Sequence, residues 1–206
     1  MNIAIIGAGN VGSALGLRLL KAGHTLYYGV RDVHKDAYEE LRKKGAKFLA
    51  PAEAAKVAEA VILAVPWSAA EETVKGLGDL GGKPLLDATN PIAPGFTLAL
   101  GYDISGGEKV QEWATNARVV KVFNNTGSEN MKNPEIGGKA LTMFYCGDDA
   151  DACKTAEAIG NAVGFEMVAA GGLANARLLE PYAFLWINLA FGLGLGQDIG
   201  FRLLRR

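Results

Sequence analysis

Residues that bind metals or form disulfides are scarce in this chain of 206 residues, which has only 2 cysteines and 2 histidines. Cys146 and Cys153 cannot build a disulfide framework, and we interpret both as structural. His24 and His34 are too few for the usual zinc-ligand patterns. We therefore expect no bound metal.

An excess of one charge is also missing. The 21 Lys and Arg residues nearly balance the 22 Asp and Glu residues, which gives a formal net charge of −1. This balance argues against a surface that binds nucleic acid. The 27 glycines are dispersed and there are only 7 prolines, so collagen-like and linker-like sequences are excluded. The first residues lack the basic region and cleavage site of a signal peptide, so we expect a cytoplasmic protein.

Uncharged stretches long enough to cross a membrane are absent as well. The segment Pro181–Gly196 carries no charge, but it has Asn188 in its middle and ends in glycines. It is shorter than the ~20 residues that a membrane helix needs. We predict a helix that is buried on nearly all sides. Because a domain of this size would struggle to cover such a helix alone, the segment indicates a homodimer formed through the C-terminal helix.

Short apolar, β-branched segments alternate with helical patterns through the first two-thirds of the chain. The expected strands are Ile3–Ile6, Thr25–Val30, Lys47–Leu49, Ala60–Ala64, Pro84–Asp87 and Arg118–Val122. The expected helices are Asn10–Ala22, Lys35–Lys44, Ala52–Val57, Ser68–Lys75 and Gly107–Thr115. This alternation is typical of βαβ units, so we predict an α/β fold with a doubly wound, mostly parallel sheet.

The rest of the chain adds fewer elements. Two more strands are expected near Leu141–Tyr145 and Phe165–Val168, on either side of a helix capped by Asp148 or Asp149. The stretch Thr89–Gly106 is long for a connection and rich in Pro and Gly, which makes it a candidate binding loop. We expect a dinucleotide-binding domain over residues 1–172 and a short C-terminal helical segment over residues 173–206.

A complete glycine motif follows the first expected strand and opens the first expected helix. It reads Gly7-Ala8-Gly9-Asn10-Val11-Gly12. Gly7 allows a tight turn, Gly9 lets the backbone approach a pyrophosphate, and Gly12 lets the helix pack closely on the sheet. The free N–H groups of the helix N-terminus would then bind the phosphates. The alternative is a purely structural turn, but this context favours a Rossmann-like dinucleotide site.

The end of the second expected strand bears on which dinucleotide is bound. An NAD-selective site has Asp or Glu there to bind the ribose 2′-hydroxyl. This sequence has Arg31, with Lys35 about one helical turn further on. A guanidinium group binds a 2′-phosphate through paired N–H donors, so we predict NADP(H). We interpret the neighbouring Asp32 as the cap of the next helix. The alternative for Arg31 is an ordinary solvated loop cation.

Six short motifs stand in a specific order along essentially the whole chain. They are Gly7–Gly12, Gly29–Arg31, Val65–Trp67, Val120–Asn125, Cys146–Asp149 and Gly171–Glu180. In this order and spacing the chain resembles the NADP-dependent oxidoreductases that reduce the 8-hydroxy-5-deazaflavin coenzyme F420. The nucleotide-binding part also resembles the cytosolic reductase domain of the STEAP membrane ferric reductases.

The resemblance implies a set of binding residues. Ala8 to Val11 would line the pyrophosphate, and Val30, Arg31 and Lys35 would hold the 2′-phosphate. Trp67 and Glu71 would lie beside the nucleotide, while the loops around Asn90 and from Asn124 to Ser128 would approach the nicotinamide. The cofactor-binding residues expected in full are Gly7, Ala8, Gly9, Asn10, Val11, Gly12, Val30, Arg31, Lys35, Val65, Pro66, Trp67, Glu71, Asn90, Asn124 and Ser128.

The chain also departs from the deazaflavin enzymes at two of these positions. Val30 stands where they typically have Ser, and Asn124 stands where they can have His. The stretch Lys121–Asn124 is closer to the Lys-Ala-Phe-Asn of the ferric reductases. Trp67 has two interpretations, packing on the nucleotide or packing on the core.

The sequence lacks an obvious acid/base set, since both histidines lie in the nucleotide half. Hydride transfer between two bound cofactors needs positioning in a dry site and no nucleophile. Asn124 and Asn125 are the candidate catalytic residues, either as donors to the carboxamide or as caps of a helix near Ser128. We predict an NADP-dependent oxidoreductase with a deazaflavin or flavin as acceptor. The alternatives are reduction of a ferric chelate, an imine or a carbonyl, and an NADPH-binding sensor without catalysis.

Overall fold

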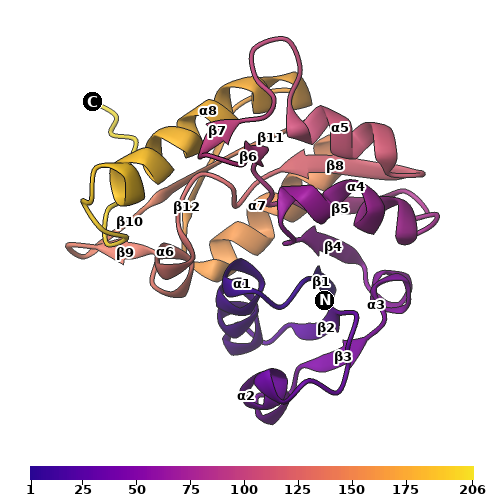
Figure 1. The fold of residues 1–206 in the computed structure, drawn as a ribbon. Helices are drawn as coiled ribbons and strands as arrows, with labels where there is room; N and C mark the ends of the chain where they lie inside the picture. The colour runs from indigo at the N-terminus through magenta and orange to yellow at the C-terminus, as the bar shows by residue number, and fades with distance from the viewer.

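The computed structural model covers residues 1–206, and an eight-stranded sheet forms its centre (Figure 1). Its strand order is β12-β11-β8-β5-β4-β1-β2-β3. The strands of this sheet are β1 (Asn2–Ile6), β2 (Thr25–Gly29), β3 (Lys47–Leu49), β4 (Ala60–Leu63), β5 (Lys83–Asp87), β8 (Ala117–Lys121), β11 (Thr142–Gly147) and β12 (Glu166–Ala169). Two short hairpins lie outside it, formed by β6 (Ile92–Ala93) with β7 (Thr97–Leu98) and by β9 (Glu135–Ile136) with β10 (Lys139–Ala140).

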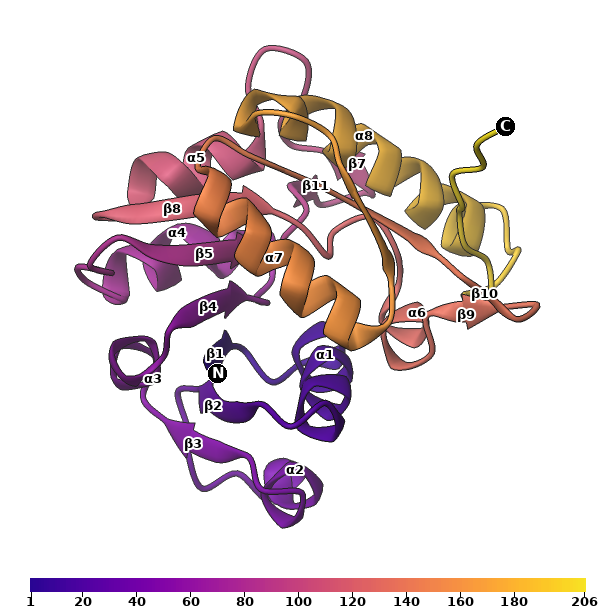
Figure 2. The same ribbon diagram turned by 180° about the vertical axis from the view of Figure 1, so that it is seen from behind.

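Helices cover both faces of the sheet. They are α1 (Asn10–Lys21), α2 (Glu39–Lys43), α3 (Pro51–Val57), α4 (Trp67–Gly76), α5 (Gly106–Trp113), α6 (Ser128–Lys132), α7 (Ala150–Val163) and α8 (Ala176–Ile187). Short 3-10 helices at Asp36–Tyr38 and Leu173–Asn175 precede α2 and α8. Helices α1, α6 and α7 pack together on one side, while α3, α4 and α5 pack on the other (Figure 2).

The alternation of side chains along the strands builds one core on each face. In β1, Ile3 and Ile5 point into the cluster beneath α1 and α7, whereas Ala4 and Ile6 point into the cluster beneath α3, α4 and α5. Successive side chains of a strand face opposite sides of a sheet, so a strand covered on both faces is apolar throughout. This explains why the buried strands appear in the sequence as continuous apolar runs.

The connectivity of the sheet creates a crevice beside β1. Strand β1 pairs in parallel with β2 on one side and with β4 on the other, and the chain leaves these neighbours in opposite directions. Ligands in such sheets bind outside the carboxyl ends of the strands at this switch point. Beyond β8 the sheet changes direction, because β11 is antiparallel to β8 and β12 follows β11 in parallel. The predicted doubly wound, mostly parallel sheet is confirmed.

Two sequence expectations about helices need correction. The helix expected over Lys35–Lys44 is broken into a 3-10 turn, Asp36–Tyr38, and the short α2. Asp32 does not cap it: its Oδ1 accepts a hydrogen bond of 3.0 Å from the backbone N–H of His34, inside the turn before the helix. Aspartate readily forms such local bonds, which compete with a helix start. The later cap is as expected, because Asp149 accepts from the N–H groups of Asp151 and Ala152.

The C-terminal helix is shorter and more exposed than expected. Helix α8 continues into a π-helical turn, Asn188–Gly192, and regular structure ends there instead of at Gly196. Gly194 and Gly196 have positive φ angles of 71° and 80°, which is incompatible with a continuing helix. In the single chain only part of the segment is buried. Its exposed apolar side chains are Leu185, Phe191, Leu193 and Leu195. No helix has the length and apolar character needed to cross a membrane.

Candidate functional site

The glycine motif forms the turn between β1 and α1. Gly7 has a φ of 103°, and a Cβ added there would collide with the carbonyl oxygen of Ala64. A Cβ on Gly12 would collide with the carbonyl oxygen of Gly7, so both positions require glycine for the protein's own packing. A Cβ on Gly9 would meet no protein atom within 4 Å. The side of Gly9 that lacks a side chain therefore faces open space, where a ligand can approach the backbone.

The start of α1 presents unpaired donors beside this turn. Gly9 occupies the N-cap position and has no side chain to bond the first-turn N–H groups. Those N–H groups and the helix dipole favour an anion at this end. Ala8, Asn10 and Val11, the other expected pyrophosphate residues, belong to the same turn and are not fully buried.

A cavity of about 480 Å³ opens next to the turn, which we call the glycine-turn cavity. It lies at the carboxyl ends of β1, β2 and β4, where the topology places a ligand. Its lining residues are Ile6, Gly7, Ala8, Gly9, Gly29, Val30, Arg31, Tyr38, Ala50, Pro51, Ala52, Ala64, Val65, Pro66, Ala69, Glu72, Thr73 and Gly76. The structure thus brings Gly7, Ala8, Gly9, Val30, Arg31, Val65 and Pro66 of the expected set into one cavity.

Arg31 is the cation of this cavity. It follows Val30, whose N–H donates to the carbonyl oxygen of Leu49 at 3.0 Å, so the end of β2 is fixed from the neighbouring strand. The Arg31 side chain is exposed and forms no ion pair or hydrogen bond within the protein. Its N–H donors are therefore available to an anionic ligand. Lys35 is also exposed, but it begins the following 3-10 turn and does not line the cavity.

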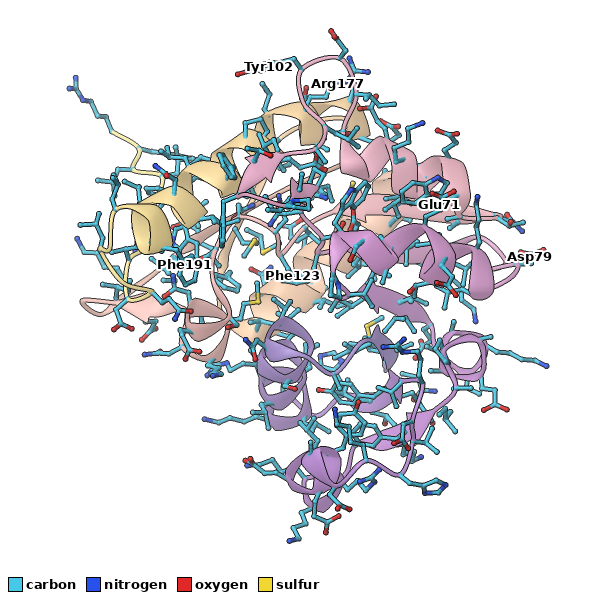
Figure 3. The ribbon with its side chains drawn as sticks, in the orientation of Figure 1. Glu71, Asp79, Tyr102, Phe123, Arg177 and Phe191 are labelled. Carbon is cyan, nitrogen blue, oxygen red and sulfur yellow. The ribbon has the colours of Figure 1, made fainter.

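Helix α4 presents a different face from the one expected. Glu71 points to solvent, where its carboxylate pairs with Lys75 at 2.6 Å (Figure 3). Trp67 packs on Trp113 of α5, with ring centroids 5.4 Å apart, and does not line the cavity. The cavity is lined instead by Ala69, Glu72 and Thr73. Ala69 and Thr73 follow Pro66 at helical spacing, and this period in the sequence is the signal that could have identified them.

Asn90 and Asn124 form a reciprocal pair across the carboxyl ends of β5 and β8. The Nδ2 of Asn90 donates to the Asn124 carbonyl oxygen at 2.8 Å, and the Nδ2 of Asn124 donates to the Asn90 Oδ1 at 3.1 Å. Asn124 also donates to the Leu179 carbonyl oxygen in α8 at 3.3 Å. These bonds fix the loop after β5, the loop after β8 and the C-terminal helix relative to one another. Neither side chain caps a helix.

The neighbouring backbone is strained, and one polar atom there is unpartnered. Phe123 lies at the centre of the molecule with a φ of 63°, a region that costs a bulky residue free energy (Figure 3). Asn125 donates to the Phe144 carbonyl oxygen at 3.0 Å, while its buried Oδ1 has no partner. Ser128 is buried and begins α6, which is capped by Gly127.

A buried charge cluster beneath these loops was not anticipated from the sequence. Lys121 is fully buried and pairs with Asp87 at 2.9 Å and with Glu180 at 2.8 Å. The Glu180 carboxylate also accepts from the N–H groups of Gly106 and Gly107, the first residues of α5. Burial alone lowers the pKa of Lys121, but the two carboxylates outweigh it and raise the pKa above the usual lysine value. The cluster joins β5, β8, α5 and α8.

A second cavity, of about 210 Å³, lies between the β6–β7 hairpin and the end of α8, and we call it the C-terminal cavity. It is lined by Phe96, Phe184, Ile187, Asn188, Phe191 and Gly192. Phe96 belongs to the stretch Thr89–Gly106 that the sequence marked as a candidate binding loop. The cavity is mainly aromatic and aliphatic, which suits a flat apolar ring.

The two cysteines are free, with Cys146 in β11 and Cys153 in α7. Burial raises the pKa of the Cys146 thiol to about 12, so it is protonated and unreactive near neutral pH. No group of three or more His, Cys, Asp or Glu side chains is arranged to hold a metal ion.

The fold and the glycine-turn cavity define a dinucleotide-binding protein of the Rossmann class. The family model of NADP oxidoreductases dependent on coenzyme F420 matches residues 2–91. The F420-dependent NADP reductase of Methanothermobacter marburgensis is 31% identical over 92% of this chain and 92% of that protein. This chain belongs to the coenzyme F420-dependent NADP oxidoreductase family.

Two further comparisons agree with that membership. The crystal structure of a putative F420-dependent NADP reductase from Arthrobacter sp. FB24 superposes with a TM-score of 0.85 at 26% identity, covering 100% of both chains. Metalloreductase STEAP3 of Rattus norvegicus is 27% identical over 86% of this chain, which corresponds to 35% of that longer protein. Both resemblances expected from the sequence motifs are confirmed.

Proposed function

We propose that this chain transfers a hydride between NADP(H) and a second redox cofactor, a deazaflavin or a flavin. The observation that carries the proposal is the glycine-turn cavity, which combines an open backbone turn at Gly9 with the unpaired cation Arg31. Membership of the family and the matching name of the Methanothermobacter relative support it. NADP(H), when bound, supplies the hydride at its nicotinamide ring.

Different residues of the chain would bind different parts of NADP(H). The N–H groups of the turn from Ala8 to Val11 would bind the pyrophosphate. Arg31, helped by Lys35 from the adjacent turn, would bind the 2′-phosphate, and Val30 would pack beside it. Val65 and Pro66 would line the path towards the nicotinamide. Because Trp67 and Glu71 face away from the cavity, we assign the α4 contact to Glu72 and Thr73.

We propose that the hydride acceptor binds near the carboxyl ends of β5 and β8, along the same edge of the sheet as the glycine-turn cavity. The paired Asn90 and Asn124 would hold the loops that flank the nicotinamide, and Asn125 and Ser128 lie in the second of these loops. The C-terminal cavity would take the acceptor ring against Phe96 and Phe191. The absence of a histidine from these loops fits transfer by positioning, with no side chain required to exchange a proton.

We also propose a cytoplasmic homodimer, and the exposed apolar residues of the C-terminal segment support the dimer. Leu185, Phe191, Leu193 and Leu195 are each about half exposed or more in the single chain. A second copy would cover this surface, which borders the C-terminal cavity. Residues 173–206 would then act as an acceptor-binding and dimerisation segment attached to the nucleotide-binding residues 1–172.

A screen of NADPH oxidation against coenzyme F420, FMN, FAD and ferric citrate tests the proposal. We expect steady turnover with the deazaflavin or a flavin, and slower turnover with NADH in place of NADPH. Turnover with ferric citrate alone would favour the activity suggested by the STEAP3 relative. Binding of NADPH without turnover with any acceptor would show a sensor instead of an enzyme.

A further inference from the structure

Arg42 binds the backbone of the turn that follows Arg31 and leads into Lys35. Its Nη1 donates to the carbonyl oxygen of Lys35 at 3.2 Å, and its Nη2 donates to the carbonyl oxygen of Val33. Both acceptors belong to one turn of backbone, so the guanidinium group clamps that turn at two points. Only arginine among the side chains offers two donors in such a rigid fork.

The Arg42 side chain is itself fixed by aromatic rings. Its guanidinium carbon lies 4.8 Å from the ring centre of Phe48 and 5.9 Å from that of Tyr38. Phe48 stacks with Tyr38, with ring centres 4.7 Å apart, and with Tyr28, with ring centres 5.0 Å apart. These contacts keep the charged group over a flat, partly buried platform.

The stacked rings of Tyr28, Phe48 and Tyr38 connect Arg42 to the glycine turn and to its cavity. The hydroxyl group of Tyr28 donates to the carbonyl oxygen of Gly12 at 3.0 Å, and Tyr38 lines the glycine-turn cavity. Arg42 forms no ion pair with any carboxylate. A residue that serves only surface solubility would not be bound so fully to backbone carbonyls and rings.

We propose that Arg42 is a positioning residue for recognition of the 2′-phosphate. It fixes the backbone from Arg31 to Lys35, so that the Arg31 guanidinium meets the phosphate in a preformed turn and loses less entropy on binding. This inference rests on the proposed NADP(H) specificity. Arg42 does not line the cavity, so it acts through Arg31 and not by touching the nucleotide.

The test compares two ligands that differ only in the 2′-phosphate, adenosine 2′,5′-bisphosphate and 5′-AMP, by calorimetry on the full chain. Arg42→Met should weaken binding of the bisphosphate by about 10-fold, the order of one charge-assisted hydrogen bond, and leave 5′-AMP within about 2-fold. Arg42→Lys keeps the charge but not the fork, and should lose most of the same discrimination. The matched control is Lys43→Met, which removes an exposed charge that pairs with Glu39 at 3.6 Å on the same helix.

A double-mutant cycle separates positioning from direct contact. In an Arg31→Ala background, Arg42→Met should weaken bisphosphate binding by much less than the about 10-fold expected alone, because the main group that it positions is gone and only the weaker contribution of Lys35 remains. Additive losses, or equal losses for 5′-AMP, would overturn the inference. If Arg42→Met does not fold, Arg42→Lys decides the question. A folded Arg42→Lys chain that still discriminates fully between the bisphosphate and 5′-AMP would also overturn the inference. If the unmodified chain does not discriminate the two ligands, the proposed NADP(H) specificity itself fails, which distinguishes the two failures.

Discussion

The proposed choice between NADP(H) and NAD(H) depends on a single guanidinium group, that of Arg31 at the end of β2. Arg31 follows a strand fixed by the Val30–Leu49 hydrogen bond, and no carboxylate of the chain neutralises it. An acidic residue in this place would bind a ribose hydroxyl and repel a phosphate. The neighbouring Asp32 does not take that role, since its carboxylate is bound to the N–H of His34.

Replacement of Arg31 should therefore separate the two nucleotides. A charge-assisted hydrogen bond contributes ~1.5–3 kcal/mol, so Arg31→Ala should weaken NADPH binding by about 10- to 150-fold. NADH binding should barely change. Calorimetric titration with both nucleotides measures the difference in affinity. Equal losses of affinity for NADPH and NADH would mean that Arg31 supports the fold and does not bind the 2′-phosphate.

Asn124 should influence turnover through orientation. Its amide group bonds to Asn90 and to the Leu179 carbonyl oxygen, so Asn124→Ala loosens two loops and α8 together. We expect single-turnover hydride transfer to slow by about 10-fold. The exposed Asn133 provides a matched control, and Asn133→Ala should leave the rate unchanged.

The pH profile of the same step tests for a hidden acid or base. Histidine is the side chain whose usual pKa lies between about 5 and 8, and neither histidine lines the glycine-turn cavity or the C-terminal cavity. The single-turnover rate should be flat between about pH 6 and 8. A bell-shaped profile in that range, or a loss of about 10³-fold in Asn124→Ala, would indicate acid/base catalysis of the kind used on imines or carbonyls.

At the scale of elements, α5 and α8 are joined by a forked ion pair. The Nε and Nη2 of Arg177 donate to the Glu108 carboxylate at 2.9 and 2.6 Å, close to the exposed loop tip at Tyr102 (Figure 3). Mainly through the Arg177 hydrogen bonds, and also through Ser105, the pKa of Glu108 is lowered to about 2 from 4.5. The carboxylate is thus more stable ionised in the folded chain than in the unfolded chain.

This shift predicts a defined loss of stability in acid. A group with a lowered folded-state pKa stabilises the fold above its unfolded pKa, and the stabilisation disappears as the pH falls from about 4.5 to 2. Urea unfolding should show Glu108→Gln to be less stable than the unmodified chain at pH 7. The two midpoints should converge towards pH 2. If the difference between the two urea midpoints stays constant with pH, the effect of the substitution comes from packing and not from charge.

The central strands of the sheet were predictable because they are buried on both faces. Ile3–Ile6 and Ala60–Ala64 are continuous apolar runs, and the structure has them as β1 and β4 to within a residue. The end of α8 was less predictable, because its apolar residues continue to Leu195 while backbone conformation at Gly194 and Gly196 ends the helix. A run of apolar residues predicts which side chains can be buried, but it does not predict the residue at which a helix ends.

Only part of the candidate site could be predicted from the sequence. The glycine turn and Arg31 lie within one local stretch of sequence, so their meeting at one cavity followed from the βαβ pattern. The Lys121 cluster did not, because Asp87 and Glu180 reach Lys121 from distant parts of the chain. A lysine in a strand is also ordinarily exposed, so only the three-dimensional arrangement identifies this one as buried.

At the scale of the whole molecule, the exposed apolar end of α8 should determine assembly. Sedimentation at micromolar concentration should give twice the chain mass of 21.7 kDa. Leu185→Arg places a charge on the 49% exposed position of α8 and should shift the species to monomer. Val57→Arg, on a comparably exposed apolar residue of α3, should leave the dimer intact. An unmodified chain that remains a soluble monomer would contradict the proposed dimer.

The two cavities also differ in when a growing polypeptide completes them. Every residue that lines the glycine-turn cavity lies between Ile6 and Gly76, whereas the C-terminal cavity needs Phe96 and residues 184–192. N-terminal parts of a chain are free to fold first during synthesis. A nascent chain that ends near residue 170 contains every residue that lines the glycine-turn cavity, while Lys121 still lacks Glu180, one of its two carboxylate partners. The ribosome thus completes the lining of the glycine-turn cavity about a hundred residues before that of the C-terminal cavity, and the buried Lys121 gains its second carboxylate partner only when α8 is made.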